Sequence, residues 1–212
     1  MKIAIIGASG FIGSALLGEA LLRGHQVTAL VRTPQRLASR PGLQAVACDV
    51  YDGAALPALL RGYDAVLVAL RGQGENDTGS HYMSGFRTLL QAARSAAVKR
   101  LLVVGGGGSL EVAPGVELLD APGFPEEYRG PAEGPRDALR LLRTETELDW
   151  TMLCPGALIE AGERTGRFRL GLDQLLVDEQ GFSRISVEDF AVAMIDELER
   201  PAHSRRRFTV GY

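Results

Sequence analysis

Residues 3–32 read IAIIGASGFIGSALLGEALLRGHQVTALVR, and this stretch decides the fold. An apolar run leads into Gly7, Gly10 and Gly13, a helical pattern follows, and a second apolar run ends at Arg32. This order predicts strand, glycine turn, helix and strand. Gly7 would allow a sharp turn, Gly10 a close approach to a pyrophosphate, and Gly13 tight packing of the helix. Because amides at a helix N-terminus bind phosphates, the stretch predicts a dinucleotide site; the alternative is an ordinary strand-to-helix turn.

The end of the second predicted strand indicates which dinucleotide is bound. A site specific for NAD places Asp or Glu there to bind the ribose hydroxyls, whereas this chain has Val31, Arg32 and Thr33. A guanidinium pairs well with a 2′-phosphate, so we predict NADP(H) as the cofactor, with NAD(H) less favoured. The alternative is that Arg32 is only a solvated surface charge.

Composition bounds the class of protein. The chain has 212 residues, 46% of them hydrophobic and 23% charged, and a net charge of −3, which predicts one globular domain over residues 1–212. The negative charge gives no reason to expect nucleic acid. No apolar run reaches membrane-spanning length, and Gly7 interrupts the N-terminal run, so we expect neither a membrane span nor a signal peptide, and a cytoplasmic location. A monomer and a homodimer are both compatible with the sequence.

Metal and thiol chemistry are not expected. Cys48 and Cys154 lie in apolar, strand-like surroundings without a CxxC motif, and we expect free, buried thiols. His25, His81 and His203 are scattered without the spacing of metal ligands, so no metal site is predicted.

Apolar runs and helical patterns alternate along the chain, which predicts an α/β protein with a Rossmann-type, doubly wound parallel sheet of about seven strands. Ser186, followed three residues later by Asp189, predicts the start of a last helix, which Pro201 ends. The predicted strands are residues 3–6, the run ending at Arg32, and residues 43–50, 65–70, 101–104, 150–154 and 208–210.

Three segments interrupt this alternation. Residues 71–80 are polar and glycine-rich, residues 105–135 form an unusually long connection, and residues 160–184 follow the sixth strand. Ligands of open α/β sheets bind beyond the carboxyl ends of the strands, where such segments would lie. We therefore expect the second and third segments to form walls of a substrate pocket, with 160–184 a small substrate-side hairpin or lid; disorder is the alternative.

The motifs extend over nearly the whole chain: GASGFIG at 7–13, VR at 31–32, CDV at 48–50, VALRG at 68–72, VVGGGGSL at 103–110 and LCPGALI at 153–159. With them the sequence resembles the atypical branch of the short-chain dehydrogenase/reductase superfamily, related to NmrA-like proteins, candidate NADH-flavin reductases and biliverdin reductase B. Its first glycine interval is one residue longer than in the Rossmann fingerprint.

The resemblance implies where the coenzyme binds. Asp49 and Val50 would flank the adenine, and residues 155–158 would border the nicotinamide. Together with the glycine turn, the expected cofactor-binding residues are Gly7, Ser9, Gly10, Phe11, Ile12, Gly13, Arg32, Asp49, Val50, Ala69, Leu70, Arg71, Gly105, Pro155, Gly156, Ala157 and Leu158.

The sequence departs from the superfamily at the catalytic pair. Most members reduce carbonyls with a tyrosine and a lysine four residues later, the lysine lowering the tyrosine pKa. Here the lysines are Lys2 and Lys99, and Ser95 stands four residues before Lys99. A flavin or quinone needs less help, because its conjugated ring delocalises the charge that hydride transfer delivers. The sequence therefore favours an NADPH-dependent oxidoreductase that reduces a flavin or quinone-like small molecule.

Two candidate catalytic residues follow from this hypothesis. Ser109 could hydrogen-bond the acceptor or the carboxamide, and Tyr128 could donate a proton or stack on the acceptor; a loop hydroxyl that satisfies the backbone and an ordinary loop tyrosine are the alternatives. Whether Arg71 or Arg164 meets an anionic substrate is open. A non-catalytic NADP-sensing regulator, like NmrA-like relatives, is the second hypothesis for function, and a sugar-nucleotide epimerase is the third.

Overall fold

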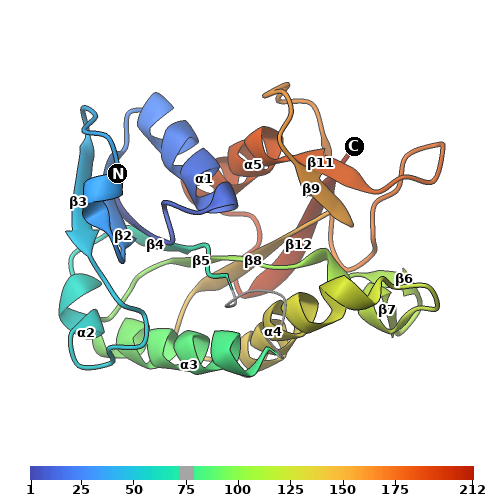
Figure 1. Ribbon diagram of the computed structural model, residues 1–212, viewed down its shortest axis with the longest axis horizontal. Coiled ribbons are helices and arrows are strands. Elements are labelled where there is room, and N and C mark those ends of the chain that lie inside the picture. Colours follow the sequence, from blue (N-terminus) through green and yellow to red (C-terminus); the bar gives the residue numbers. More distant parts are fainter. Residues whose placement is uncertain (72–78) are drawn as a thin grey trace.

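One large sheet with helices on both faces forms the centre of the protein (Figure 1). The structure is a computed structural model that describes residues 1–71 and 79–212. Within these residues, seven strands run parallel and an eighth, at one edge, is antiparallel to its neighbour. In order across the sheet they are β3 (Leu43–Ala47), β2 (Gln26–Val31), β1 (Lys2–Ile6), β4 (Ala65–Val68), β5 (Leu101–Val104), β8 (Trp150–Pro155), β12 (Arg206–Gly211) and β10 (Arg169–Gly171). The predicted Rossmann-type fold is confirmed.

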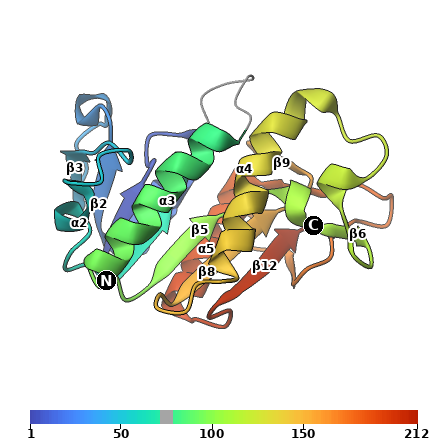
Figure 2. The same ribbon diagram turned by 90° about the horizontal axis from the view of Figure 1, so that it is seen from below.

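The strands are apolar throughout because the sheet is covered on both faces. In β1, Ile3 and Ile5 belong to one core, whereas Ala4 and Ile6 belong to the other. Successive side chains of a strand point to opposite faces, so one short run supplies two cores. One face carries α1 (Phe11–Leu22) and α5 (Val187–Glu199), and the other carries α2 (Leu56–Leu59), α3 (Ser80–Ser95) and α4 (Glu126–Leu142) (Figures 1 and 2).

Two strands end earlier than the sequence predicts. The third predicted strand, 43–50, ends at Ala47, and the fourth, 65–70, ends at Val68. Residues 48–50 and 69–71 therefore lie in loops beyond the carboxyl ends of β3 and β4. These loops are the parts of the chain that can face a ligand at this edge of the sheet.

Helix α4 corrects the expectation for residues 105–135. It begins at Glu126, so the last ten residues of the predicted connection are helical even though Pro131 and Pro135 lie inside the helix. Packing explains this outcome. A Cβ at Gly134 would lie 2.8 Å from Cγ of Tyr82, and one at Gly106 would lie 3.3 Å from Cβ of Pro135. Tertiary contacts thus outweigh the low helix propensity of proline and glycine.

The other irregular segments contain short strands. Residues 160–184 include β10, which pairs with β12, and residues 107–109 and 118–120 form short 3₁₀ turns. Residues 72–78, part of the predicted 71–80 loop, lie outside the described residues. The remaining strands form two small sheets: β6 (Glu111–Ala113) with β7 (Val116–Glu117), and β9 (Leu158–Glu160) with β11 (Arg184–Ser186).

The length and composition of the helices also bear on membrane insertion. Across residues 1–71 and 79–212, none of the helices combines the length and apolar character that a membrane crossing requires.

Candidate cofactor site

The turn between β1 and α1 can only be built from glycine. Gly7 has φ +78°, and a Cβ there would lie 2.2 Å from the carbonyl oxygen of Ala69. A Cβ at Gly13 would lie 2.0 Å from the carbonyl oxygen of Gly7. Both distances are far below van der Waals contact, so these positions hold α1 against the turn and the turn against the loop after β4.

The N-terminus of α1 is left open by this turn. Gly10 is the N-cap residue and offers no side chain to the first-turn amides. The backbone amide of Ser14 donates to the carbonyl of Gly10 at 2.8 Å, which leaves the amides of residues 11–13 before the first intrahelical bond. Unpaired amides at a helix N-terminus, with the helix dipole behind them, fit a pyrophosphate.

The glycine turn and the amides of residues 11–13 are together called the phosphate cradle below. A pocket of about 620 Å³ lies directly beside it. Its walls are the loops beyond the carboxyl ends of β1, β2, β3 and β4, at the point where the strand order reverses. This is where doubly wound sheets bind ligands. The lining residues are Ile6, Gly7, Ser9, Gly10, Leu30, Val31, Arg32, Cys48, Asp49, Val50, Tyr51, Ala69, Leu70, Arg71 and Tyr82.

The charges around the pocket suit phosphate groups. Arg32 and Arg71 are exposed at its rim, and neither forms a hydrogen bond or ion pair with any residue that the structure describes. The Asp49 carboxylate accepts a hydrogen bond from the backbone amide of Tyr51 at 3.0 Å. Within the described part of the chain, the pocket lining therefore contains two guanidinium groups without side-chain partners and one carboxylate that is already hydrogen-bonded.

Nine of the predicted cofactor-binding residues line this pocket, and the others lie around it. Residues 11–13 form the first turn of α1. Gly105 follows β5, where a Cβ would lie 2.5 Å from Sγ of Cys154, and residues 155–158 follow along the same edge of the sheet at the end of β8. These positions extend the site from the pocket toward β5 and β8. Their contact with a coenzyme stays a prediction.

The two candidate catalytic residues lie apart from the pocket lining. Ser109 is 1% exposed; its hydroxyl donates to the carbonyl of Gly106 at 3.0 Å, and Arg207 donates to that hydroxyl at 3.3 Å. These are the contacts of a serine that stabilises its own loop. Tyr128 is 61% exposed and lies in the first turn of α4, not in a loop.

The cysteines are unpaired and buried, as the sequence predicts. Burial, reinforced by the carboxylates of Asp49 and Asp52, raises the pKa of the Cys48 thiol to about 11. Burial likewise raises the pKa of Cys154. Both groups are therefore thiols at neutral pH, and neither is a ready nucleophile. Among the described residues, no cluster of three or more histidine, cysteine, aspartate or glutamate side chains could hold a metal ion.

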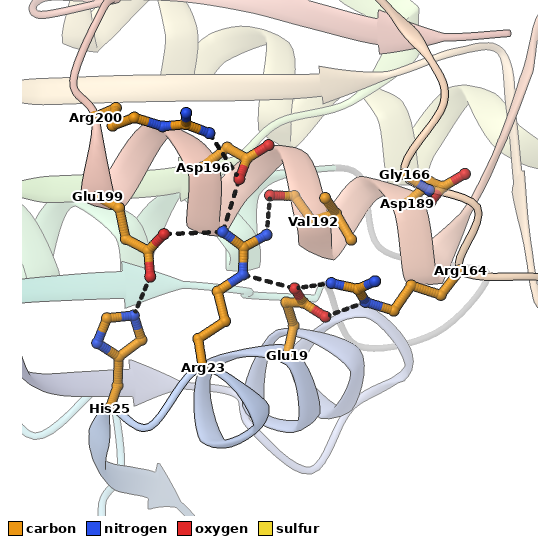
Figure 3. A network of polar contacts seen from close by, with 10 residues as sticks. All are labelled: Glu19, Arg23, His25, Arg164, Gly166, Asp189, Val192, Asp196, Glu199 and Arg200. Atoms are coloured by element: carbon orange, nitrogen blue, oxygen red, sulfur yellow. Dashed lines mark hydrogen bonds and ion pairs between the residues drawn. The ribbon is translucent and has the colours of Figure 1, made fainter.

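Arg164, which the sequence left open as a contact for an anionic substrate, pairs with a carboxylate of the protein itself. Its guanidinium donates to the Glu19 carboxylate at 2.7 and 2.8 Å, and Arg23 donates to the same carboxylate at 2.7 Å (Figure 3). Glu19 is 5% exposed and lies on α1, the helix that carries the phosphate cradle. The 160–184 segment is thus joined to α1. The two residues are 145 positions apart, and the sequence gave no signal for this contact.

Sequence reasoning also missed two tyrosines in the pocket wall. Tyr51 follows the CDV motif directly, so its place after β3 was a usable signal. Tyr82 shares a helical apolar pattern with Phe86 and Leu89, which made it look like an ordinary core residue. The structure shows that the Tyr82 side chain reaches both the core and the pocket.

Comparison with known proteins agrees with this geometry. The model of the NAD(P)H-binding family matches residues 7–198, and the chain belongs to this family. The resemblance to the atypical branch of the short-chain dehydrogenase/reductase superfamily is thereby confirmed, and the class is that of NAD(P)-binding Rossmann proteins.

Solved structures resemble this one over its full length. A candidate exported protein from Burkholderia pseudomallei is 47% identical with a TM-score of 0.90, and each chain is covered completely. A candidate epimerase from Bacteroides thetaiotaomicron is 43% identical with a TM-score of 0.93, covering 100% of this chain and 96% of that one. A candidate NADH-flavin reductase from Streptococcus pneumoniae is 34% identical with a TM-score of 0.89, covering 100% and 99%.

Proposed function

We propose that the protein is an NADPH-dependent reductase of a small flavin or quinone-like acceptor. The observation that carries this proposal is the glycine-built cradle beside a pocket whose rim holds Arg32, which has no side-chain partner among the residues that the structure describes. The amides of residues 11–13 would hold the pyrophosphate, and Arg32 the 2′-phosphate. When bound, the coenzyme supplies a hydride.

The position of the lysines supports an acceptor that needs no proton relay. Lys2 is the first residue of β1, and Lys99 lies just before β5. Both are therefore at the amino edge of the sheet, opposite the pocket, where neither can lower the pKa of a catalytic tyrosine. The chain can bind, orient and shield two flat reactants, which is sufficient for transfer to a conjugated ring.

Ser109 and Tyr128 remain part of the proposal, with roles in shaping the site and contacting the acceptor. Ser109, fixed by Gly106 and Arg207, would hold the glycine-rich loop after β5 in shape. Tyr128, being exposed at the start of α4, could contact an acceptor that enters from solvent. The proposed compartment is the cytoplasm, where unpaired thiols such as Cys48 and Cys154 stay reduced.

An assay of NADPH oxidation distinguishes a reductase from a nucleotide sensor. Oxidation of NADPH should be followed at 340 nm with FMN, FAD and a soluble naphthoquinone as acceptors. We expect steady turnover with at least one of them, faster with NADPH than with NADH. Tight NADPH binding without turnover on any acceptor would instead favour the NADP-sensing regulator.

The epimerase hypothesis has one specific point in its favour, the similarity to the candidate epimerase from Bacteroides thetaiotaomicron. Against it, this chain lacks the tyrosine and lysine pair that epimerase chemistry usually uses. Conversion of a nucleotide sugar with no net NADPH consumption would support it over the reductase.

A further inference from the structure

Tyr82 occupies a buried position at which a phenylalanine would make the same packing contacts. It belongs to the first turn of α3, is 4% exposed and lines the pocket. Its hydroxyl oxygen is buried and has no hydrogen-bond partner among the residues that the structure describes. Buried tyrosine hydroxyls are ordinarily paired, because an unpaired one loses its hydrogen bonds to water without replacement.

The ring of Tyr82 is closely packed, whereas its hydroxyl has no hydrogen-bond partner within residues 1–71 and 79–212. The ring stacks on Phe86, with centroids 6.0 Å apart, and Gly134 makes room for it, since a Cβ there would lie 2.8 Å from Tyr82 Cγ. Phenylalanine would satisfy every one of these contacts. The oxygen is therefore the one part of this side chain that packing does not explain.

The phenol lies close to Cys154, near the end of β8. Burial raises the pKa of Tyr82, and the neighbouring Cys154 at the end of β8 raises it further, so the phenol stays protonated and can donate. In the sheet, β1, β4 and β5 separate β8 from β2, whose end carries Arg32. A dinucleotide whose 2′-phosphate meets Arg32 would extend its other half toward β5 and β8.

We propose that Tyr82 is a coenzyme-binding residue whose hydroxyl hydrogen-bonds the nicotinamide nucleoside half of the dinucleotide. This inference rests on the proposed function, since it requires NADPH to occupy the pocket. The coenzyme would supply the hydrogen-bond partner that the described residues do not give this phenol. The core position then contributes to binding as well as to packing.

The test compares Tyr82→Phe with wild type for two ligands by titration calorimetry. NADPH carries both halves of the dinucleotide, whereas 2′,5′-ADP carries only the 2′-phosphorylated adenosine half. We expect Tyr82→Phe to bind NADPH roughly 2- to 12-fold more weakly, the range for one lost hydrogen bond, and to bind 2′,5′-ADP unchanged. Its melting temperature without ligand should equal or exceed that of wild type.

Tyr63→Phe is the matched control. Tyr63 is partly buried near the amino end of β4, with the Lys2 ammonium 5.0 Å from its ring centroid, and it does not line the pocket. Both ligands should bind this variant as they bind wild type.

Three results would overturn the inference: unchanged NADPH binding by Tyr82→Phe, an equal loss of affinity for both ligands, or a lower melting temperature of the ligand-free variant. The last would show that the hydroxyl has a structural role. A wild-type protein that binds neither NADPH nor 2′,5′-ADP would overturn the proposed function itself.

Discussion

Arg32 stands alone at the end of β2, exposed at the pocket rim and unpaired within the described part of the chain. A surface arginine with no carboxylate beside it contributes little to the stability of the fold. Its removal should therefore change ligand binding without changing folding. That separation makes position 32 a clean site for testing coenzyme choice.

Arg32→Ala should weaken NADPH binding by about 10- to 100-fold, the range for a lost charge-assisted, bidentate contact with phosphate. The affinity for NADH, which has no 2′-phosphate, should stay the same. Dissociation constants of both coenzymes measure the effect. Arg36→Ala, an exposed arginine four residues further on that does not line the pocket, is the control. If both coenzymes lose affinity equally, Arg32 does not read the 2′-phosphate.

At the scale of elements, α1, α5 and the 160–184 segment are joined by one ionic network (Figure 3). Arg23 donates to Glu19, Asp196 and Glu199, at 2.7, 2.7 and 2.9 Å, and Arg164 adds the third element through Glu19. The hydrogen bond from Arg164 holds the pKa of Glu19 below its usual value, against the effect of burial, with Arg23 acting in the same direction. An ionised, nearly buried carboxylate thus holds three elements together.

This network predicts acid sensitivity. Because the folded-state pKa of Glu19 lies below its unfolded value of about 4.5, the stabilisation is present above that pH and is lost as pH falls through the folded pKa. Glu19→Gln should lower the free energy of unfolding at pH 7 by about 1–3 kcal/mol and flatten its dependence on pH below 4.5. Urea unfolding at several pH values measures both effects. Glu179→Gln, at an exposed position, should leave the curve unchanged, and a parallel loss in both variants would refute the assignment to Glu19.

The elements also show what the sequence could predict. Apolar runs located the parallel strands and the glycine spacing located the turn between β1 and α1, because these depend on local patterns. Residues 126–135 were expected to be a connection, since Pro131 and Pro135 disfavour a helix locally and the packing of Gly134 on Tyr82 is not visible in the sequence. The pairing of Glu19 with Arg164 was missed for the same reason, as it joins distant parts of the chain.

For the whole molecule, the coenzyme should act as a stabilising ligand. The pocket lies between loops from four strands, and the cradle contacts both the turn after β1 and the loop after β4. Occupying it at 100 times the dissociation constant should add about 2.7 kcal/mol, or roughly 5–10 °C in melting temperature for a domain of this size. Thermal unfolding with NADPH, NADH and no ligand measures this, with the larger shift expected for NADPH. The absence of any shift at saturating NADPH would contradict the binding site.

The contact between Arg164 and Glu19 has a consequence for engineering. A designer who wished to change the acceptor would start by grafting the acceptor-side loop from another member of the family into this scaffold. Any donor loop without an arginine in register with position 164 would leave a buried anion at Glu19 with only Arg23 to compensate it. The chimaera would then be destabilised at α1, the helix that begins in the phosphate cradle, although none of the residues of α1 had been exchanged.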